Sequence, residues 1–232
     1  MNIKYPFWGE NRVKYCGGVS SDPYMELTCE ESVPKITIND VKYRILDWNG
    51  TIQKLTVARD DYWSGICAVS VSDKHKNITF DNTQFQRDGD VSSQICLLYN
   101  CDTSTMNIFS TTCGNTKVSY TIVDLASASL TCTPSVIVEF PILAVQATQI
   151  ATLNDINETL QGGFDLKWTG NYGECQKCVD SDGVCGSNDG GNEFRCFCKD
   201  GSHTTSCASQ KVLTSNNSMH ILLTQTPIYV CF

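Results

Sequence analysis

Residues 175–207 read CQKCVDSDGVCGSNDGGNEFRCFCKDGSHTTSC, and this stretch decides how the C-terminal part of the chain can fold. A segment this short cannot bury a hydrophobic core of its own, so it depends on cross-links. Thiols at this density are either oxidised to disulfides or bound to a metal ion. The six cysteines are Cys175, Cys178, Cys185, Cys196, Cys198 and Cys207.

The spacing of these cysteines favours disulfides over zinc. A structural zinc site uses two well-separated pairs of cysteine or histidine ligands. Cys175 and Cys178 form one such pair, but a single residue separates Cys196 from Cys198, which is too tight for the second pair. We therefore expect oxidised cysteines and no bound metal.

The whole chain also indicates an oxidising compartment. It has 14 cysteines in 232 residues, which is above the usual share. It carries four N-glycosylation sequons without a central proline, and together with the cysteines these predict a secreted glycoprotein. The sequon asparagines, expected on exposed surface, are Asn49, Asn77, Asn157 and Asn216.

The ends of the chain and its apolar runs bear on targeting. Residues 1–6, MNIKYP, lack the apolar stretch of a signal peptide, so we expect the leader to be missing from this chain. The best apolar run, residues 136–145, contains Glu139 and Pro141 and has about half the length that spans a bilayer. We expect no transmembrane segment.

Alternating apolar and polar residues predict strands through most of residues 1–145. The clearest run is KITIN at residues 35–39, and the Asn49-Gly50 dipeptide predicts a hairpin turn that leads directly into residues 51–58. β-branched residues dominate, which favours a mainly β, disulfide-rich fold. The other expected strands are residues 41–46, 77–80, 95–99, 118–123, 136–140 and 164–168.

One short amphipathic helix is expected between residues 149 and 161. Ile150, Leu153, Ile156 and Leu160 recur at spacings of three and four, which places them on one helix face. The glycine pair at 162–163 ends the pattern.

A series of short blocks extends from residue 3 to residue 207. Together and in this order, the blocks resemble the extracellular region of plant wall-associated and leaf-rust-resistance-type receptor-like kinases. They are IKYPFWG (3–9), YCG (15–17), LTC (27–29), ITI (36–38), YRIL (43–46), LTVARDDY (55–62), LLYNC (97–101), GFDLKW (163–168) and FRCFCKDG (194–201).

The resemblance implies a domain organisation. It implies a galacturonan-binding-like β-rich domain over residues 3–102, a wall-associated-kinase-type C-terminal module over residues 103–207 and a poorly ordered tail over residues 208–232. It also implies a place in the cell wall or on the outer face of the plasma membrane. Kinase motifs do not occur in the sequence, so we expect an ectodomain without the transmembrane helix and kinase.

The last four cysteines of the cluster, spaced C-x10-C-x-C-x8-C, resemble the second half of an EGF-like repeat. This analogy implies the pairs Cys175–Cys185, Cys178–Cys196 and Cys198–Cys207, among the 15 connectivities that six cysteines allow. The small EGF-like module would act as a rigid spacer. Because the family has two further cysteines before the tyrosine-proline block, two of the matched cysteines are expected to lack partners here.

The family implies binding of galacturonan, the acidic backbone of pectin. A polyanion prefers a basic groove, yet the chain has a net charge of −8. Residues 1–60 hold eight of the 17 basic residues and eight of the 25 acidic ones, so the N-terminal third is the better location. Arginine grips a carboxylate with two parallel hydrogen bonds, which makes Arg12, Arg44 and Arg59 the candidates.

Aromatic side chains offer flat faces for sugar rings, and the candidates are Tyr5, Trp8 and Trp63. The ordinary alternative is core packing for these aromatics and solvated charge for the arginines. Calcium, which takes oxygen ligands, is a second route because it can bridge uronate to protein carboxylates. However, Asp180, Asp182 and Asp189 lie in glycine-rich turns without the spacing of a calcium loop, which is typical of turn residues.

The sequence does not favour an enzyme. None of the three histidines has a motif partner, and the adjacent pair Asp60 and Asp61 faces opposite ways on a strand, unlike glycosidase carboxylates. Nucleic acid is not an expected partner. The alternative to polysaccharide binding is a receptor ectodomain or soluble decoy in defence signalling that binds a protein or peptide, including a co-receptor. Salt-sensitive, uronate-dependent binding would distinguish the first function from the second.

Overall fold

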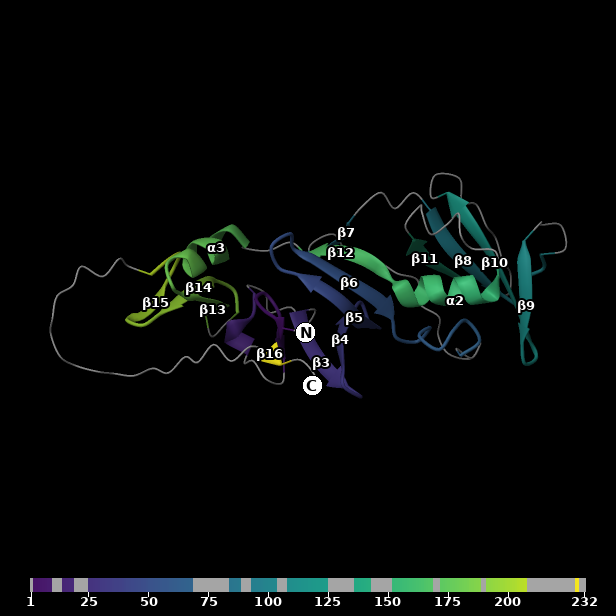
Figure 1. Cartoon of the computed structure of the whole chain (residues 1–232), viewed down its shortest axis with the longest axis horizontal. Helices are drawn as coiled ribbons and strands as arrows, with labels where there is room; N and C mark the ends of the chain where they lie inside the picture. Colours follow the sequence, from purple (N-terminus) through teal and green to yellow (C-terminus); the bar gives the residue numbers. More distant parts are fainter. Residues whose placement is uncertain are drawn as a thin grey trace. The chain divides into compact units, whose positions relative to one another are not determined.

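The structure is a computed structural model that describes residues 2–9, 14–18, 25–68, 84–88, 93–103, 108–124, 136–142, 152–168, 172–188, 191–207 and 228–229. Strands dominate these residues (Figure 1), which confirms the mainly β, disulfide-rich fold. The chain divides into two compact units of non-contiguous segments. The first contains Met1–Thr37, Trp48–Gln53 and Trp168–Phe232, and the second contains Ile38–Asp47 and Lys54–Lys167.

Four strands lie side by side in one sheet of the second unit, in the order β5 (Val41–Asn49), β6 (Lys54–Arg59), β12 (Phe164–Trp168) and β7 (Phe85–Arg87). Alternation decides which face is buried. Tyr43 of β5, Leu55 of β6 and Leu166 of β12 are almost fully buried. The next residue of each strand, Arg44, Thr56 or Lys167, is partly or fully exposed. β6 and β12 pair antiparallel although a long stretch of chain separates them.

A four-stranded antiparallel sheet completes the second unit. Its order is β11 (Val136–Ile142), β8 (Ser93–Tyr99), β10 (Thr116–Asp124) and β9 (Phe109–Cys113). Ile95 and Leu97 of β8 and Val118 of β10 are fully buried against Ile156 and Leu160. The latter two lie on helix α2 (Leu153–Gly162), so the helix covers one face of this core (Figure 1).

Local contacts fix both ends of helix α2, which begins at Leu153, whereas the expected helix began at residue 149. Thr152 is the N-cap: its hydroxyl accepts a hydrogen bond from the Asp155 N–H at 3.2 Å, and the Asp155 carboxylate accepts one from the Thr152 N–H at 2.7 Å. Gly163 ends the helix with a φ of 68°. A Cβ at this position would lie 2.1 Å from the Val57 carbonyl oxygen, so only glycine lets the chain pass this close to β6. The expected helix is confirmed.

The first unit contains three groups of paired strands, of which two are small sheets of their own. β2 (Trp8–Gly9) pairs parallel with β3 (Glu26–Glu30), which pairs antiparallel with β4 (Val33–Ile38). β1 (Asn2–Ile3) pairs antiparallel with β16 (Ile228–Tyr229). The rest of the expected tail, residues 208–227 and 230–232, lies outside the described residues. A short 3-10 helix, η1 (Lys14–Cys16), follows β2 in the chain.

The third group is the sheet of the cysteine-rich segment, with strands β13 (Val184–Ser187), β14 (Phe194–Cys198) and β15 (Gly201–His203). A second helix, α3 (Tyr172–Asp180), precedes it. We expected a single helix, and α3 is the correction. Its stripe of buried residues consists of Cys175 and Cys178, whose three-residue spacing we took only as a ligand or disulfide signal.

Two strand expectations need comment. β6 begins at Lys54, not at residue 51, because Asn49 accepts backbone hydrogen bonds from Thr51 and Ile52 and holds a longer turn. The expected strand at 77–80 lies outside the described residues.

Neither α2 nor α3 is long and apolar enough to cross a bilayer, and no other described helix is.

The capping box of α2 generates the first prediction. Thr152→Ala removes the acceptor for the Asp155 N–H and should lower the free energy of unfolding by about 1 kcal/mol. Urea denaturation under non-reducing conditions measures this change. Thr152→Ser, which keeps the hydroxyl, should leave the midpoint near that of the wild type. Equal stability of all three proteins would contradict the role of the cap.

The pairing of β6 with β12 generates the second prediction. In a fragment of residues 1–102, β6 loses its partner and exposes Leu55 and Val57 at a sheet edge. We expect this fragment to be unfolded or aggregated, as measured by near-UV circular dichroism and size-exclusion chromatography. A soluble, cooperatively unfolding fragment would contradict this, and would support the boundary at 102/103, which stays a prediction.

Candidate functional site

Three disulfides hold the cysteine-rich segment together: Cys175–Cys185, Cys178–Cys196 and Cys198–Cys207. These are the pairs that the EGF-like analogy implies. A Cβ at Gly183 would lie 2.4 Å from the Cys196 sulfur and within 3 Å of two more. The disulfides therefore pack so closely that a side chain at position 183 would displace them.

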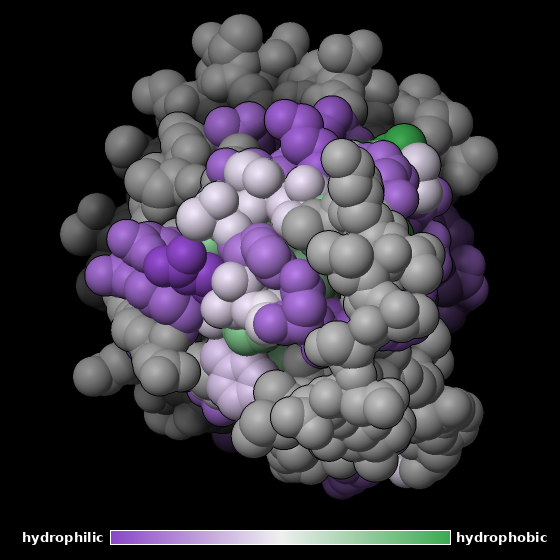
Figure 2. Space-filling model, turned by 90° about the vertical axis from the view of Figure 1, so that its left-hand side faces the viewer, coloured by the Kyte–Doolittle hydropathy of each residue, from purple (hydrophilic) through white to green (hydrophobic). Residues whose placement is uncertain are grey.

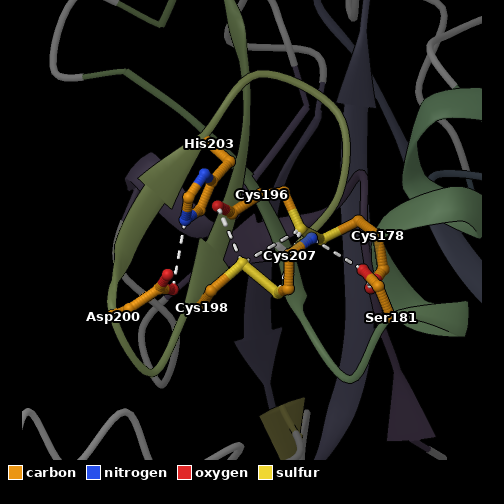
Figure 3. A network of polar contacts seen from close by, with 7 residues as sticks. All are labelled: Cys178, Ser181, Cys196, Cys198, Asp200, His203 and Cys207. Atoms are coloured by element: carbon orange, nitrogen blue, oxygen red, sulfur yellow. Dashed lines mark hydrogen bonds and ion pairs between the residues drawn. A yellow bond between two sulfur atoms is a disulfide. The ribbon is translucent and has the colours of Figure 1, made fainter. Parts of the chain in front are cut away.

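Hydrogen bonds beside these disulfides join Cys207 to Ser181 and Ser181 to Cys178 (Figure 3). The Cys207 N–H donates to the Ser181 hydroxyl at 2.8 Å, and that hydroxyl donates to the Cys178 carbonyl at 2.8 Å. His203 lies 3.1 Å from Asp200, and its hydrogen bond lowers the pKa of the Asp200 carboxyl. The cysteines nearby are oxidised, so their sulfurs are not thiolate ligands for a metal.

Cysteines outside residues 175–207 form disulfides that the sequence did not predict. Cys67 is joined to Cys113 of β9, and Cys29 and Cys101 each take part in a disulfide. Cys16, which lies in a family-matched block, is a free thiol; the sequence predicted two matched cysteines without partners but did not identify them. Cys96 is a fully buried cysteine in β8.

Arg44 has the geometry of a carboxylate receptor. Its Nε donates to Asp60 at 2.6 Å, and its guanidinium carbon lies 4.7 Å from the centre of the Trp63 ring. Stacking and ion pair fix the plane of the guanidinium. Among the described residues, the two terminal nitrogens of Arg44 have no hydrogen-bond acceptor. The two nitrogens of this edge can donate two parallel hydrogen bonds to a carboxylate.

The Arg59 side chain is buried and paired with Asp61. It is only 3% exposed, both Nε and Nη2 bond the Asp61 carboxylate, and its guanidinium lies 5.0 Å from the Tyr62 ring centre. Alternation along β6 gives the signal that separates the two arginines, because Leu55, Val57 and Arg59 share the buried face. On β5, Arg44 points to the opposite side from buried Tyr43.

Three buried tyrosines interact electrostatically with Arg59 and Asp61. Burial raises the pKa of Tyr99 to about 12 and raises the pKa values of Tyr43 and Tyr62 further. The Tyr99 hydroxyl donates to the Ile66 carbonyl at 3.1 Å. The three phenols therefore stay neutral at physiological pH and add no negative charge beside Arg59.

The remaining candidates lie in the first unit. Tyr5 is half-buried and packs edge-on against Phe194 at 6.0 Å, and half-buried Trp8 lies in β2. Tyr15 packs in the same way against Phe197. The cysteine-rich segment thus contacts the N-terminal segment within one unit. Arg12 lies outside the described residues.

The sequons differ in their surroundings. Asn49 is exposed in the turn after β5, whereas Asn157 is partly buried and accepts a hydrogen bond from the Ile66 N–H at 3.2 Å. Asn77 and Asn216 lie outside the described residues. Figure 2 shows that the described residues on one face of the molecule are mostly hydrophilic, with only small hydrophobic areas among them.

Comparison with known proteins adds family evidence. Residues 1–59 match the family model "Wall-associated receptor kinase galacturonan-binding", and residues 100–201 match "Wall-associated receptor kinase C-terminal". Both describe extracellular modules, not catalytic ones. No solved structure matches.

Curated relatives agree with the two family models. The chain is 24% identical over 230 residues to the leaf rust 10 disease-resistance locus receptor-like protein kinase-like 2.1 of Arabidopsis thaliana, covering 91% of this chain and 34% of that protein. It is 27% identical over 185 residues to the 2.4 relative of the same species, covering 78% and 28%. The chain spans about a third of these proteins or less. The chain therefore carries the two modules of a wall-associated-kinase-type extracellular region, and over most of its length it is similar to the corresponding part of leaf-rust-10-type receptor-like kinases.

Proposed function

We propose that this region binds an acidic wall polysaccharide of the galacturonan class, with Arg44 as the carboxylate contact and Trp63 beside it. The observation that carries the proposal is the terminal edge of Arg44, which has no acceptor among the described residues, on a guanidinium already fixed by Asp60 and Trp63. Arg44 also lies within the segment that matches the galacturonan-binding family model.

The local charge supports this assignment despite the acidic chain. Asp60 and Asp61 each neutralise one arginine, and Lys42, two residues from Arg44 on the same strand, is exposed. Residues 1–60, which include Arg44, hold equal numbers of basic and acidic residues, whereas the chain as a whole carries −8. Arg44 and Asp60 are 16% and 20% exposed, so their field is less screened than that of a fully solvated pair.

Aromatic stacking is the second supporting feature. Trp63 is half-buried, with Arg44 over its ring. A tryptophan beside a carboxylate-binding arginine suits a sugar acid, which presents an apolar ring face and a carboxylate together. Arg59 is not part of the proposed contact, because burial and Asp61 occupy it. Calcium bridging through exposed carboxylates remains part of the proposal as a second route.

Removing the guanidinium tests the proposal. Arg44→Ala should weaken binding of a de-esterified oligogalacturonide by about tenfold or more, because a hydrogen bond to a charged group contributes about 1.5–3 kcal/mol. Arg44→Lys, which keeps the charge without the planar fork, should fall between Arg44→Ala and the wild type. Isothermal titration calorimetry at low and physiological salt, with calcium and with chelator, measures the affinities.

Arg87→Ala is the matched control, because Arg87 is an exposed arginine of the same unit and its loss changes the net charge equally. Its affinity should stay near that of the wild type. Binding that requires calcium and is unchanged by Arg44→Ala would place the contact at exposed carboxylates instead of at Arg44. A folded, glycosylated wild type that does not bind the oligogalacturonide would refute the proposal in favour of a protein or peptide partner.

A further inference from the structure

Trp63 lies in a short segment, residues 62–67, that follows β6 and Asp60. Its described backbone hydrogen bonds form turns: the Trp63 N–H donates to the carbonyl of Asp60, just before the segment, at 3.2 Å, and the Gly65 N–H donates to the Tyr62 carbonyl at 2.9 Å. Isolated turns of this kind do not hold one conformation in water. The position of Trp63 therefore depends on what the segment is attached to.

Helix α2 attaches the segment at two points. The Gln161 side chain donates to the Trp63 carbonyl at 2.8 Å, and the Asn157 side chain accepts from the Ile66 N–H at 3.2 Å. These residues are four apart, so they lie on one helix face. Gly65 fits beneath the Asn157 amide with a φ of 99°, where an added Cβ would lie 2.9 Å from Asn157 Oδ1.

Other anchors hold the far end of the segment. Tyr99 donates to the Ile66 carbonyl, and the disulfide to Cys113 fixes Cys67. Asp60 accepts from the Trp63 N–H, and among the described contacts the Gln161 side chain is the helix contact made to the Trp63 carbonyl. Gln161 thus joins helix α2 to the residue whose ring stacks on the Arg44 guanidinium.

We propose that Gln161 is a positioning residue for the ligand contact, holding Trp63 so that its ring supports Arg44. This inference rests on the proposed function for its ligand part. It also assigns ligand recognition to both family-matched segments, because Gln161 lies in residues 100–201 and Arg44 in residues 1–59. Neither segment alone then forms the contact.

Gln161→Met tests the proposal, because methionine has a similar length and no charge but cannot donate the hydrogen bond. We expect it to weaken oligogalacturonide binding about three- to tenfold, the effect of one hydrogen bond. Amide hydrogen exchange at Gly65 and Ile66 should accelerate by a similar factor, while exchange in β8 stays unchanged. Gln86→Met, at an exposed glutamine of the same unit, is the control and should change neither quantity.

A double-mutant cycle separates positioning from a general loss of stability. If Gln161 acts through the Trp63–Arg44 stack, Gln161→Met should have much less effect in an Arg44→Lys background than in the wild type. Equal effects in both backgrounds would overturn the proposal. Unchanged exchange at Gly65 and Ile66 would overturn the positioning itself. A wild type that fails to bind would instead overturn the proposed function and with it the ligand part of this inference.

Discussion

The antiparallel pairing of β6 with β12 is the constraint on which the second unit depends. Phe164 lies opposite Val57 and Leu166 opposite Leu55, which joins apolar residues of both strands on the buried face. On the other face, Asp165 accepts hydrogen bonds from Lys54 at 2.9 Å and Thr56 at 2.6 Å. Thr56 and Asp165 are 109 residues apart, but loop-closure entropy grows only slowly with length, so apolar burial in the strand pair can offset it.

This pairing also places helix α2. The helix ends one residue before β12, and Gly163 must approach the Val57 carbonyl for the chain to enter the sheet. With that end fixed, Ile156 and Leu160 reach the core formed by β8 and β10, while Asn157 and Gln161 meet the 62–67 segment. Helix α2 thus packs the core through Ile156 and Leu160, and it holds the 62–67 segment through Asn157 and Gln161.

Local patterns predicted the elements whose signals are local. β4, β5 and α2 were predictable because alternation, three- and four-residue spacing and a glycine stop all lie within a few residues. Features that depend on which distant segments meet were not predictable, and these include the Cys67–Cys113 disulfide and the pairing of Arg44 with Asp60. The burial of Arg59 had a local signal, since it continues the apolar face of β6, but its charge led us to expect an exposed side chain.

The two arginines show why residue type alone does not define a binding site. Arg59 spends its Nε–Nη2 edge on Asp61 inside the unit, so no carboxylate of a ligand can replace that partner without leaving Asp61 uncompensated. Arg44 uses Nε alone, which orients the guanidinium and leaves its terminal edge without an acceptor among the described residues. Asp60 therefore has two opposing effects, since its charge repels an approaching uronate while its hydrogen bond holds the arginine ready. Because the attraction acts through two directed hydrogen bonds and the repulsion through one more distant charge, the fork is expected to dominate. Under the proposed function, one oriented arginine would let an acidic chain recognise an acidic polymer without a basic groove.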